Sequence, residues 1–497
     1  MSVALREADP SSAPEPGAGA RSTRFVRERL GPNPETALAV GGGVVVVVIC
    51  LGFFALASFT DADTWVPVSV AFFLTLISVP LCARLAGTPR DRRLFKILVI
   101  AFGLKMLFTG PRYVLNEVYY KGEVDAARYD QAGDFFVQNA SRGHFSIEGS
   151  ELDDFPRETR VVGYVVGGLY VLFGTTYFGG YLIFSWLSWL GLVCFFKAFR
   201  VAYPNAPPYR AAMLIFFLPS MLFWPSSLGK DALMVFCLGV VTLGISRLVT
   251  GAHTWRGVVM AGAGLYVTSL IRPHLVLIAL VALAASTLAR SSNATGARSV
   301  LFRVAVVAAI FPLMLVGLSR MGDVVGGSDT AGFEENLDRT VARTNTGGSA
   351  FEVSTVRSPL DIPEATLTVI YRPFLFESAN LGVLIAAIEG TILIVMTILA
   401  SRWVWRIFPA MVSSPMAAWC GAYVGAFVIA FSNIGNAGIL ARQRVQMFPV
   451  LMILVAAAYE HYRVHVLVDS SEPDGDVPAT PPVLSRTAHT TSGSPVS

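Results

Sequence analysis

Charged residues are scarce in this 497-residue chain: only 14% of its residues are Asp, Glu, Lys or Arg, while 54% are hydrophobic. Its mean hydropathy of +0.59 lies well outside the range of soluble globular proteins. The apolar residues come in blocks of about 20, long enough to cross a hydrocarbon core of roughly 30 Å. The scarcity of charge therefore excludes a soluble enzyme and predicts a polytopic membrane protein.

Cysteine and the common catalytic motifs are also scarce or missing. The sequence has no Walker-type phosphate loop, no paired-histidine metal motif and no nucleophile elbow. Its first 36 residues lack the early apolar core of a cleavable signal peptide. The cysteines all fall in apolar segments without metal-ligand spacing, which indicates packing residues rather than disulfides: Cys50, Cys82, Cys194, Cys237 and Cys420. We expect no cofactor and no nucleic-acid partner, so an activated lipid donor or an ion gradient must drive any transfer.

The apolar blocks predict an all-α fold with about 12 transmembrane helices in a membrane domain over residues 37–465. Residues 1–36 and 466–497 are expected to be disordered tails. Residues 160–175 are apolar but short and glycine-rich, so we expect a juxtamembrane or re-entrant helix there. The expected spans are 37–60, one ending near 83, 95–111, 177–197, 210–225, 231–249, 257–272, 275–291, 300–319, 379–400, 411–431 and 446–462.

Basic residues predict the orientation of these helices. Lys and Arg cluster in the N-terminal tail and in the segments 84–96, 197–210, 247–256, 290–303 and 402–406. By the positive-inside rule, both termini then lie in the cytoplasm of a multi-pass cell-membrane protein. The segments expected to face outward are the long polar stretches 112–158 and 320–360 and the short turns 224–231, 272–274 and 433–445. We expect the first long outward loop to contain a juxtamembrane helix.

An acidic cluster opens this first outward loop. Asp125, Tyr129 and Gly133 have helical spacing and share one face of an amphipathic helix. Asp125 follows soon after the membrane exit, where it could deprotonate an acceptor hydroxyl as a general base. Tyr129 is a substrate-binding candidate, whereas Asp130 falls off that face and is a secondary catalytic candidate. The alternative interpretation is a solvated acidic loop, and Asp125, Asp130 and Asp134 could also supply oxygen ligands to a divalent metal.

Two short outward turns carry the next candidates, as substrate-binding residues. Lys230 and Asp231 follow a proline- and serine-rich turn. A favourable interaction with the N-terminus of the next helix explains Asp231. It does not explain Lys230, because a cation in the first helical turn is unfavourable unless an anion lies opposite. Arg272 and His274 flank a proline, where Arg272 either snorkels to the interface or binds phosphate and His274 could donate a proton.

The C-terminal half adds further candidates. Arg372 and Glu377 flank the start of an apolar helix that contains Glu389, which we interpret first as half of a structural pair with an arginine. The Asn- and Gly-rich run before Arg442 and Arg444 favours irregular backbone, which a membrane tolerates only where it is buried or lines a cavity. The two arginines suit phosphate or pyrophosphate, with snorkelling as the alternative for Arg444.

Taken together, these motifs resemble the GT-C superfamily of integral-membrane glycosyltransferases, especially bacterial relatives of the protein O-mannosyltransferases and the lipid A aminoarabinose transferase. Asp125, in Asp-Ala-Ala-Arg-Tyr-Asp, matches the acidic residue that these enzymes place in their first large extracytoplasmic loop. The stretch Phe-Trp-Pro-Ser-Ser before Lys230 and Asp231 resembles their second outward turn. The resemblance covers roughly residues 95–290 and implies a sugar donor on a polyprenyl phosphate, whose phosphate is held by basic residues.

The sequence therefore predicts a glycosyltransferase that moves a sugar from a polyprenyl-phosphate donor to a glycan, lipid or protein acceptor in envelope or exopolysaccharide assembly. Asp125 would be the base, and the departing phosphate would be neutralised by Lys230, Arg272, Arg372, Arg442 and Arg444.

Two alternatives remain open. A polysaccharide polymerase acting on lipid-linked repeat units would suit the loop 320–360 with Arg339, Arg343 and Arg357. A transporter or lipid flippase should instead place charges near the bilayer midplane, where Glu389 is the main example.

Overall fold

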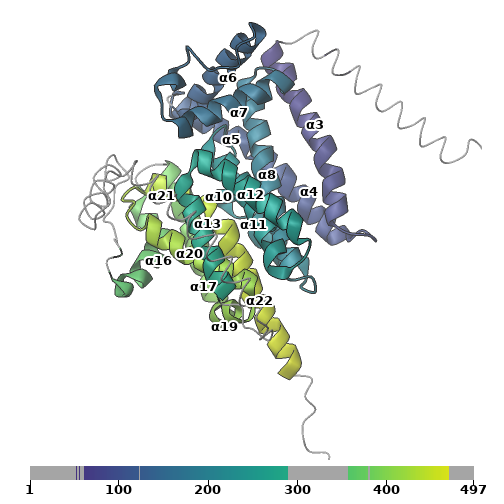
Figure 1. Cartoon of the computed structure of the whole chain (residues 1–497), viewed down its shortest axis with the longest axis vertical. Coiled ribbons are helices and arrows are strands. Elements are labelled where there is room, and N and C mark those ends of the chain that lie inside the picture. Colours follow the sequence, from purple (N-terminus) through teal and green to yellow (C-terminus); the bar gives the residue numbers. More distant parts are fainter. Residues whose placement is uncertain are drawn as a thin grey trace, which may run out of the picture. The chain divides into compact units, whose positions relative to one another are not determined.

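The computed structural model describes residues 61–122, 124–288, 358–378 and 381–469, together with Gly52, Ala55 and Val356. All regular elements in these ranges are helices, and no strand occurs in them (Figure 1). The chain divides into two units, Met1–Ser69 and Val70–Ser497. Helix α3 (Ala62–Leu85) crosses the boundary, and the packing described below belongs to the second unit.

Several long apolar helices indicate a multi-pass membrane protein. Two further helix pairs, bent by 113° and 58° at short breaks, raise the number of candidate spans in the described ranges from five to seven if each pair crosses once. The five are Asp63–Leu85 of α3, the run Arg92–Tyr119, α8 (Tyr177–Ala202), α11 (Lys230–Thr250) and α17 (Leu381–Leu399). The bent pairs are Ser401–Ser413 with Pro415–Phe431 and Ala437–Gln446 with Phe448–Val466.

This number is smaller than the expected 12 or so. The span expected at 300–319 and, apart from Gly52 and Ala55, the span expected at 37–60 lie outside the described residues, as does most of the loop 320–360 with Arg339, Arg343 and Arg357. The described residues of the expected spans 257–272 and 275–291 belong to two helices, α12 (Thr254–Ile271) and α13 (Pro273–Leu288), which are not among the five candidate spans. Segment 160–175 forms α7 (Arg157–Phe173), which is likewise not a candidate span.

The span expected at 210–225 is wrong. Its residues form two short helices, α9 (Pro208–Phe216) and α10 (Pro219–Phe223). The helix breaks because Pro219 has no backbone N–H to donate and its ring clashes with the preceding turn. Polar side chains satisfy the interrupted backbone: Lys105 Nζ donates to the Met221 carbonyl at 2.6 Å. A carboxylate oxygen of Glu389 accepts from the Ser220 N–H at 2.6 Å, as irregular backbone within a membrane requires.

The remaining elements complete the helical fold around these spans. The run Arg92–Tyr119 consists of α4 (Arg92–Leu107), α5 (Thr109–Val114) and the π-helical turn η1 (Leu115–Tyr119). Helix α6 packs against α7, and α7 packs against α12 (Figure 1). The other elements are α6 (Asp125–Ser141), η2 (Glu151–Asp154), η3 (Pro359–Asp361), α16 (Ile362–Tyr371), η4 (Leu375–Glu377), α18 (Ser401–Val404), α19 (Ile407–Ser413), α20 (Pro415–Phe431), α21 (Ala437–Gln443), η5 (Arg444–Gln446) and α22 (Phe448–Asp469).

Helix α11 packs closely against α8 through two glycines. A Cβ atom placed on Gly191 would lie 2.4 Å from the Val235 carbonyl oxygen, and one on Gly239 would lie 2.4 Å from the Gly191 carbonyl oxygen. Small residues let two membrane helices bring their backbones together and gain van der Waals contact. This contact fixes α11, whose first turn carries Lys230 and Asp231.

We expect Gly191→Ala to lower the free energy of unfolding by about 1–3 kcal/mol, because the added methyl group forces α8 away from α11. The measurement is the thermal unfolding midpoint of the purified protein in detergent. Gly262→Ala on α12 is the matched control, since a Cβ there meets no atom within 4 Å. Equal midpoints for the two variants would contradict the close approach.

Candidate functional site

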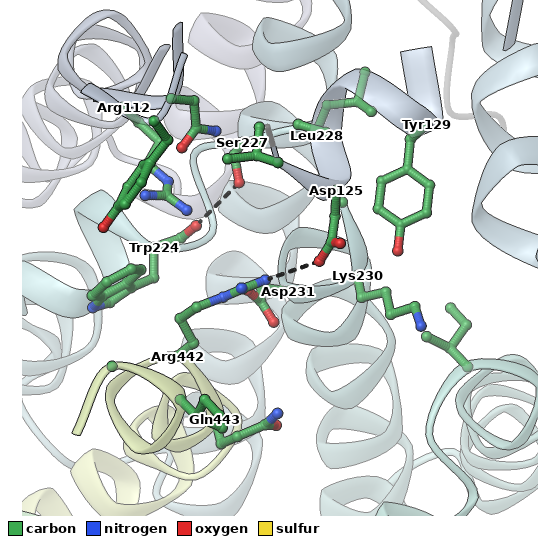
Figure 2. A pocket seen from close by; sticks show the side chains of 18 of the residues that line it. Arg112, Asp125, Tyr129, Trp224, Ser227, Leu228, Lys230, Asp231, Arg442 and Gln443 are labelled. Carbon is green, nitrogen blue, oxygen red and sulfur yellow. Dashed lines mark hydrogen bonds and ion pairs between the residues drawn. The ribbon is translucent and has the colours of Figure 1, made fainter. Parts of the chain in front are cut away.

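A cavity of about 630 Å³ lies where segments far apart in the sequence meet (Figure 2). Its walls come from the end of the run Arg92–Tyr119, the start of α6, the turn into α11, the end of α12, and α21. Among the described residues, its charged lining groups are two carboxylates and four cations: Asp125, Asp231, Arg112, Lys230, Arg272 and Arg442. The cavity therefore combines an excess of positive charge with acidic groups.

Asp231 holds two of the arginines in place. Its side chain is only 4% exposed and lies in the first turn of α11. One carboxylate oxygen accepts from Arg272 Nη2 at 2.8 Å, and the other accepts from Arg442 Nε at 3.1 Å. Arg272 also donates through Nη1 to Gln443 Oε1 at 2.8 Å. Because both oxygens of Asp231 already accept from guanidinium groups, this carboxylate organises the site rather than meeting a ligand.

Asp125 is the carboxylate that remains accessible. It is the first residue of α6, and its side chain is 58% exposed. Arg442 reaches toward it from α21, with Nη2 3.9 Å from Oδ2 (Figure 2). Arg128 Nη1 lies 3.7 Å from the other oxygen. These distances exceed those of a good hydrogen bond, so Asp125 can still accept a proton from a bound molecule.

Arg112 is a buried cation that the sequence analysis missed. It is 6% exposed and lies over the rings of Phe223 and Trp224, at 5.3 and 5.0 Å from their centroids. Its Nε has no hydrogen-bond partner, and no salt bridge to it occurs in the described part of the chain. A buried charge without a partner is unfavourable, so this position favours an incoming anion. The sequence held one signal for it: Arg112 is the first residue of the stretch 112–158, which is expected to face outward, where basic residues are less common.

Tyr129 and Lys230 complete this wall. Burial moves the pKa of the Tyr129 phenol further above neutral, so its hydroxyl is a hydrogen-bond donor over a still wider pH range than an exposed tyrosine. Its ring lies against Gly229: a Cβ atom placed on this glycine would lie 3.6 Å from the nearest carbon of the Tyr129 ring. Lys230 Nζ donates to the neutral Thr159 Oγ1 at 2.8 Å, and no salt bridge to this ammonium group occurs in the described part of the chain.

Five of the predicted residues do not line the cavity: Asp130, His274, Arg372, Glu377 and Arg444. The Tyr170 hydroxyl of α7 donates to Asp130, so this carboxylate faces α7, in agreement with its place off the Asp125 face. The His274 ring packs against Phe431, with centroids 5.7 Å apart. The secondary catalytic role of Asp130 and the proton-donor role of His274 therefore have no geometric support at this cavity.

Arg372 and Glu377 form an ion pair of their own away from the cavity, with Arg372 Nη2 2.6 Å from Glu377 Oε1. Burial acts to raise the pKa of Glu377, but hydrogen bonds from Arg372 and the Phe374 N–H outweigh it and hold the pKa below its usual value. The pair joins the residue after α16 to the turn η4 (Leu375–Glu377).

Arg444 is fully buried and forms hydrogen bonds to backbone carbonyl groups. Its guanidinium donates to the carbonyl oxygens of Ile370, Arg372 and Ala386, and Nη2 lies 3.8 Å from Glu389 Oε2. The interpretation of Glu389 as half of a structural pair with an arginine is thus confirmed. A phosphate-binding role for Arg444 is not supported, because its side chain is fully buried outside the cavity and both of its terminal nitrogens donate to backbone carbonyls. Its Nε has no hydrogen-bond partner, but it is buried with the rest of the side chain.

The acidic cluster does not form a metal site in this structure. Within the described ranges, no group of three His, Cys, Asp or Glu side chains could hold a metal ion. Asp125 faces the cavity whereas Asp130 faces α7, so the set with Asp134 does not converge on one point.

Comparisons with known proteins add no assignment to this geometry. No protein-family model matches the chain, and no curated protein or solved structure is significantly similar to it.

Proposed function

We propose that this protein is an integral-membrane glycosyltransferase that takes its sugar from a polyprenyl-phosphate donor, as the resemblance to the GT-C superfamily implies. The observation that carries the proposal is the cavity with an accessible carboxylate, Asp125, among four cations. One carboxylate, Asp231, already pairs with two of these cations. The remaining positive charge favours a phosphate, and the accessible carboxylate can act on a hydroxyl beside it.

The reaction is an inverting single displacement. The acceptor hydroxyl gives its proton to the Asp125 carboxylate, and its oxygen attacks the anomeric carbon of the sugar. The bond from that carbon to the phosphate oxygen breaks, and the lipid phosphate leaves with the electron pair. Arg112, Lys230, Arg272 and Arg442 stabilise the negative charge that develops on this phosphate.

From the positive-inside rule we infer that this cavity faces the outer surface of the cell membrane. Support comes from the lining, which draws on the stretch 112–158 and on the turns 224–231, 272–274 and 433–445, all expected outside. Leu107, Val114 and Val118 are exposed on one face of the helical run that carries Arg112. An exposed apolar face on a membrane-spanning helix contacts the bilayer, where the polyprenyl chain of the donor would lie.

We expect Arg112→Gln to raise the KM for the lipid donor by roughly tenfold to a hundredfold, because a charge-assisted contact to the phosphate is lost. The measurement is transfer in proteoliposomes supplied with a labelled polyprenyl-phosphate sugar over a range of concentrations. Arg142→Gln, at an exposed position after α6, is the control for loss of one positive charge. An unchanged KM for Arg112→Gln would remove the phosphate role of Arg112, and absence of transfer from any polyprenyl-phosphate sugar would overturn the proposed function.

The polysaccharide polymerase remains the alternative, because the same cations suit a lipid pyrophosphate. Supplying a repeat unit on lipid pyrophosphate separates the two: chain-length growth from this donor, without transfer from the monophosphate, favours the polymerase. Glu389, on which a transporter or flippase would depend, is paired with Arg444 and Ser220.

A further inference from the structure

A second cavity, of about 380 Å³, lies between α4, α9 and α22. It shares no lining residue with the first cavity. Arg93 lines it at the start of the run Arg92–Tyr119, whereas Arg112 lines the first cavity near the end of that run. At the rise of an α-helix, these two residues lie about 28 Å apart, close to the thickness of a hydrocarbon core. The two cavities therefore correspond to opposite membrane surfaces.

Three arginines line the second cavity, and aromatic rings orient two of them. The Arg93 guanidinium lies 4.6 Å from the centroid of Tyr209, and the Arg210 guanidinium lies 3.5 Å from the centroid of Tyr459. Stacking of this kind fixes the plane of a guanidinium while leaving the N–H groups at its edge free to bind.

The carboxylates near this cavity already have partners. Glu460, which lines it, accepts from Arg463 Nε at 2.8 Å and also from Nη2. Asp91, at the start of α4, accepts from the Tyr209 hydroxyl at 2.7 Å and from the Arg93 backbone N–H at 2.9 Å. In the described part of the chain, neither the Arg93 nor the Arg210 side chain forms a salt bridge.

We propose that this second cavity binds a phosphate group, carried either by an anionic phospholipid or by a small soluble phosphate. Two guanidinium groups without a carboxylate partner give the cavity an excess of positive charge, and their forked N–H groups match the oxygens of a phosphate. The volume fits a headgroup or a small phosphate ester. The site does not depend on the proposed sugar transfer.

The test uses the full-length protein in nanodiscs of phosphatidylcholine, with or without phosphatidylglycerol. Native mass spectrometry measures retained phosphatidylglycerol, and calorimetry measures binding of inorganic phosphate in phosphatidylcholine alone. We expect the double variant Arg93→Gln/Arg210→Gln to weaken either the retention of phosphatidylglycerol or the binding of inorganic phosphate at least tenfold. Retention of phosphatidylglycerol identifies the lipid source, whereas calorimetric binding of phosphate identifies the soluble one.

Two further variants keep the test decisive. Arg92→Gln removes an exposed positive charge next to Arg93 in the sequence that does not line the cavity, and it should leave binding unchanged. Glu460→Gln frees Arg463 from its partner and should tighten phosphate binding severalfold, a gain that misfolding cannot mimic. The proposal fails if the wild type binds neither probe, if Arg92→Gln weakens binding as much as the double variant, or if Glu460→Gln brings no gain.

Discussion

Replacing Asp125 with Asn is expected to slow sugar transfer by about 10²–10⁴-fold, the usual contribution of a general base. The amide has nearly the same shape as the carboxylate but cannot take the proton of the acceptor hydroxyl. Because Asp125 is exposed and only loosely paired with Arg442 and Arg128, the substitution should not disturb the fold. The measurement is the initial rate in proteoliposomes at saturating labelled polyprenyl-phosphate sugar.

Asp153→Asn is the matched control for this prediction. Asp153 lies in the same expected loop, is similarly exposed and does not line the cavity. We expect its variant to transfer sugar at the wild-type rate and the Asp125 variant to bind donor with an unchanged KM. Transfer by Asp125→Asn at near wild-type rates would remove Asp125 as the base, whatever the role of the cations.

The second large effect concerns stability. Arg444→Met should lower the free energy of unfolding by about 3–5 kcal/mol, because it leaves the Glu389 carboxylate buried without its cation. The substitution also removes the donor to the Ile370 and Ala386 carbonyls. The measurement is unfolding of the purified protein in detergent, followed by tryptophan fluorescence.

A double variant separates charge from packing in this effect. Adding Glu389→Gln to Arg444→Met removes the uncompensated charge, so part of the lost stability should return. If the double variant is less stable than Arg444→Met by the full effect of Glu389→Gln alone, the two side chains act independently. That result would contradict the structural pair.

The helices of the candidate site were predictable from the sequence because apolar blocks and their polar ends mark where a chain leaves a membrane. The alternation of basic loops then predicted that Asp125, Lys230, Arg272 and Arg442 lie on one side, and the first cavity brings them together. Helical spacing also separated Asp125 from Asp130, in agreement with the contact of Asp130 to α7.

Other features depend on tertiary contacts that no local pattern encodes. Which carboxylate stays accessible depends on the approach of Arg272 and Arg442 to Asp231, from segments far along the chain. Arg112 lies over the Phe223 ring of α10. The sequence hydropathy alone predicted one continuous helix there, so it gave no sign of this environment. Arg444 was predicted to bind phosphate because the sequence could not show its backbone partners, which lie 58 to 74 residues away along the chain.

The broken segment α9–α10 predicts covariation among homologous chains. Glu389 bonds to the Ser220 N–H, a group that an unbroken helix would satisfy by itself. Lys105 bonds to the Met221 carbonyl, whose helical donor four residues on would be Pro225, which has no N–H. A homologous chain without Pro219 would therefore leave Glu389 without its backbone partner, and one without Pro225 would do the same for Lys105. Across descendants of a common ancestor, Pro219 should vary together with Glu389, and Pro225 with Lys105.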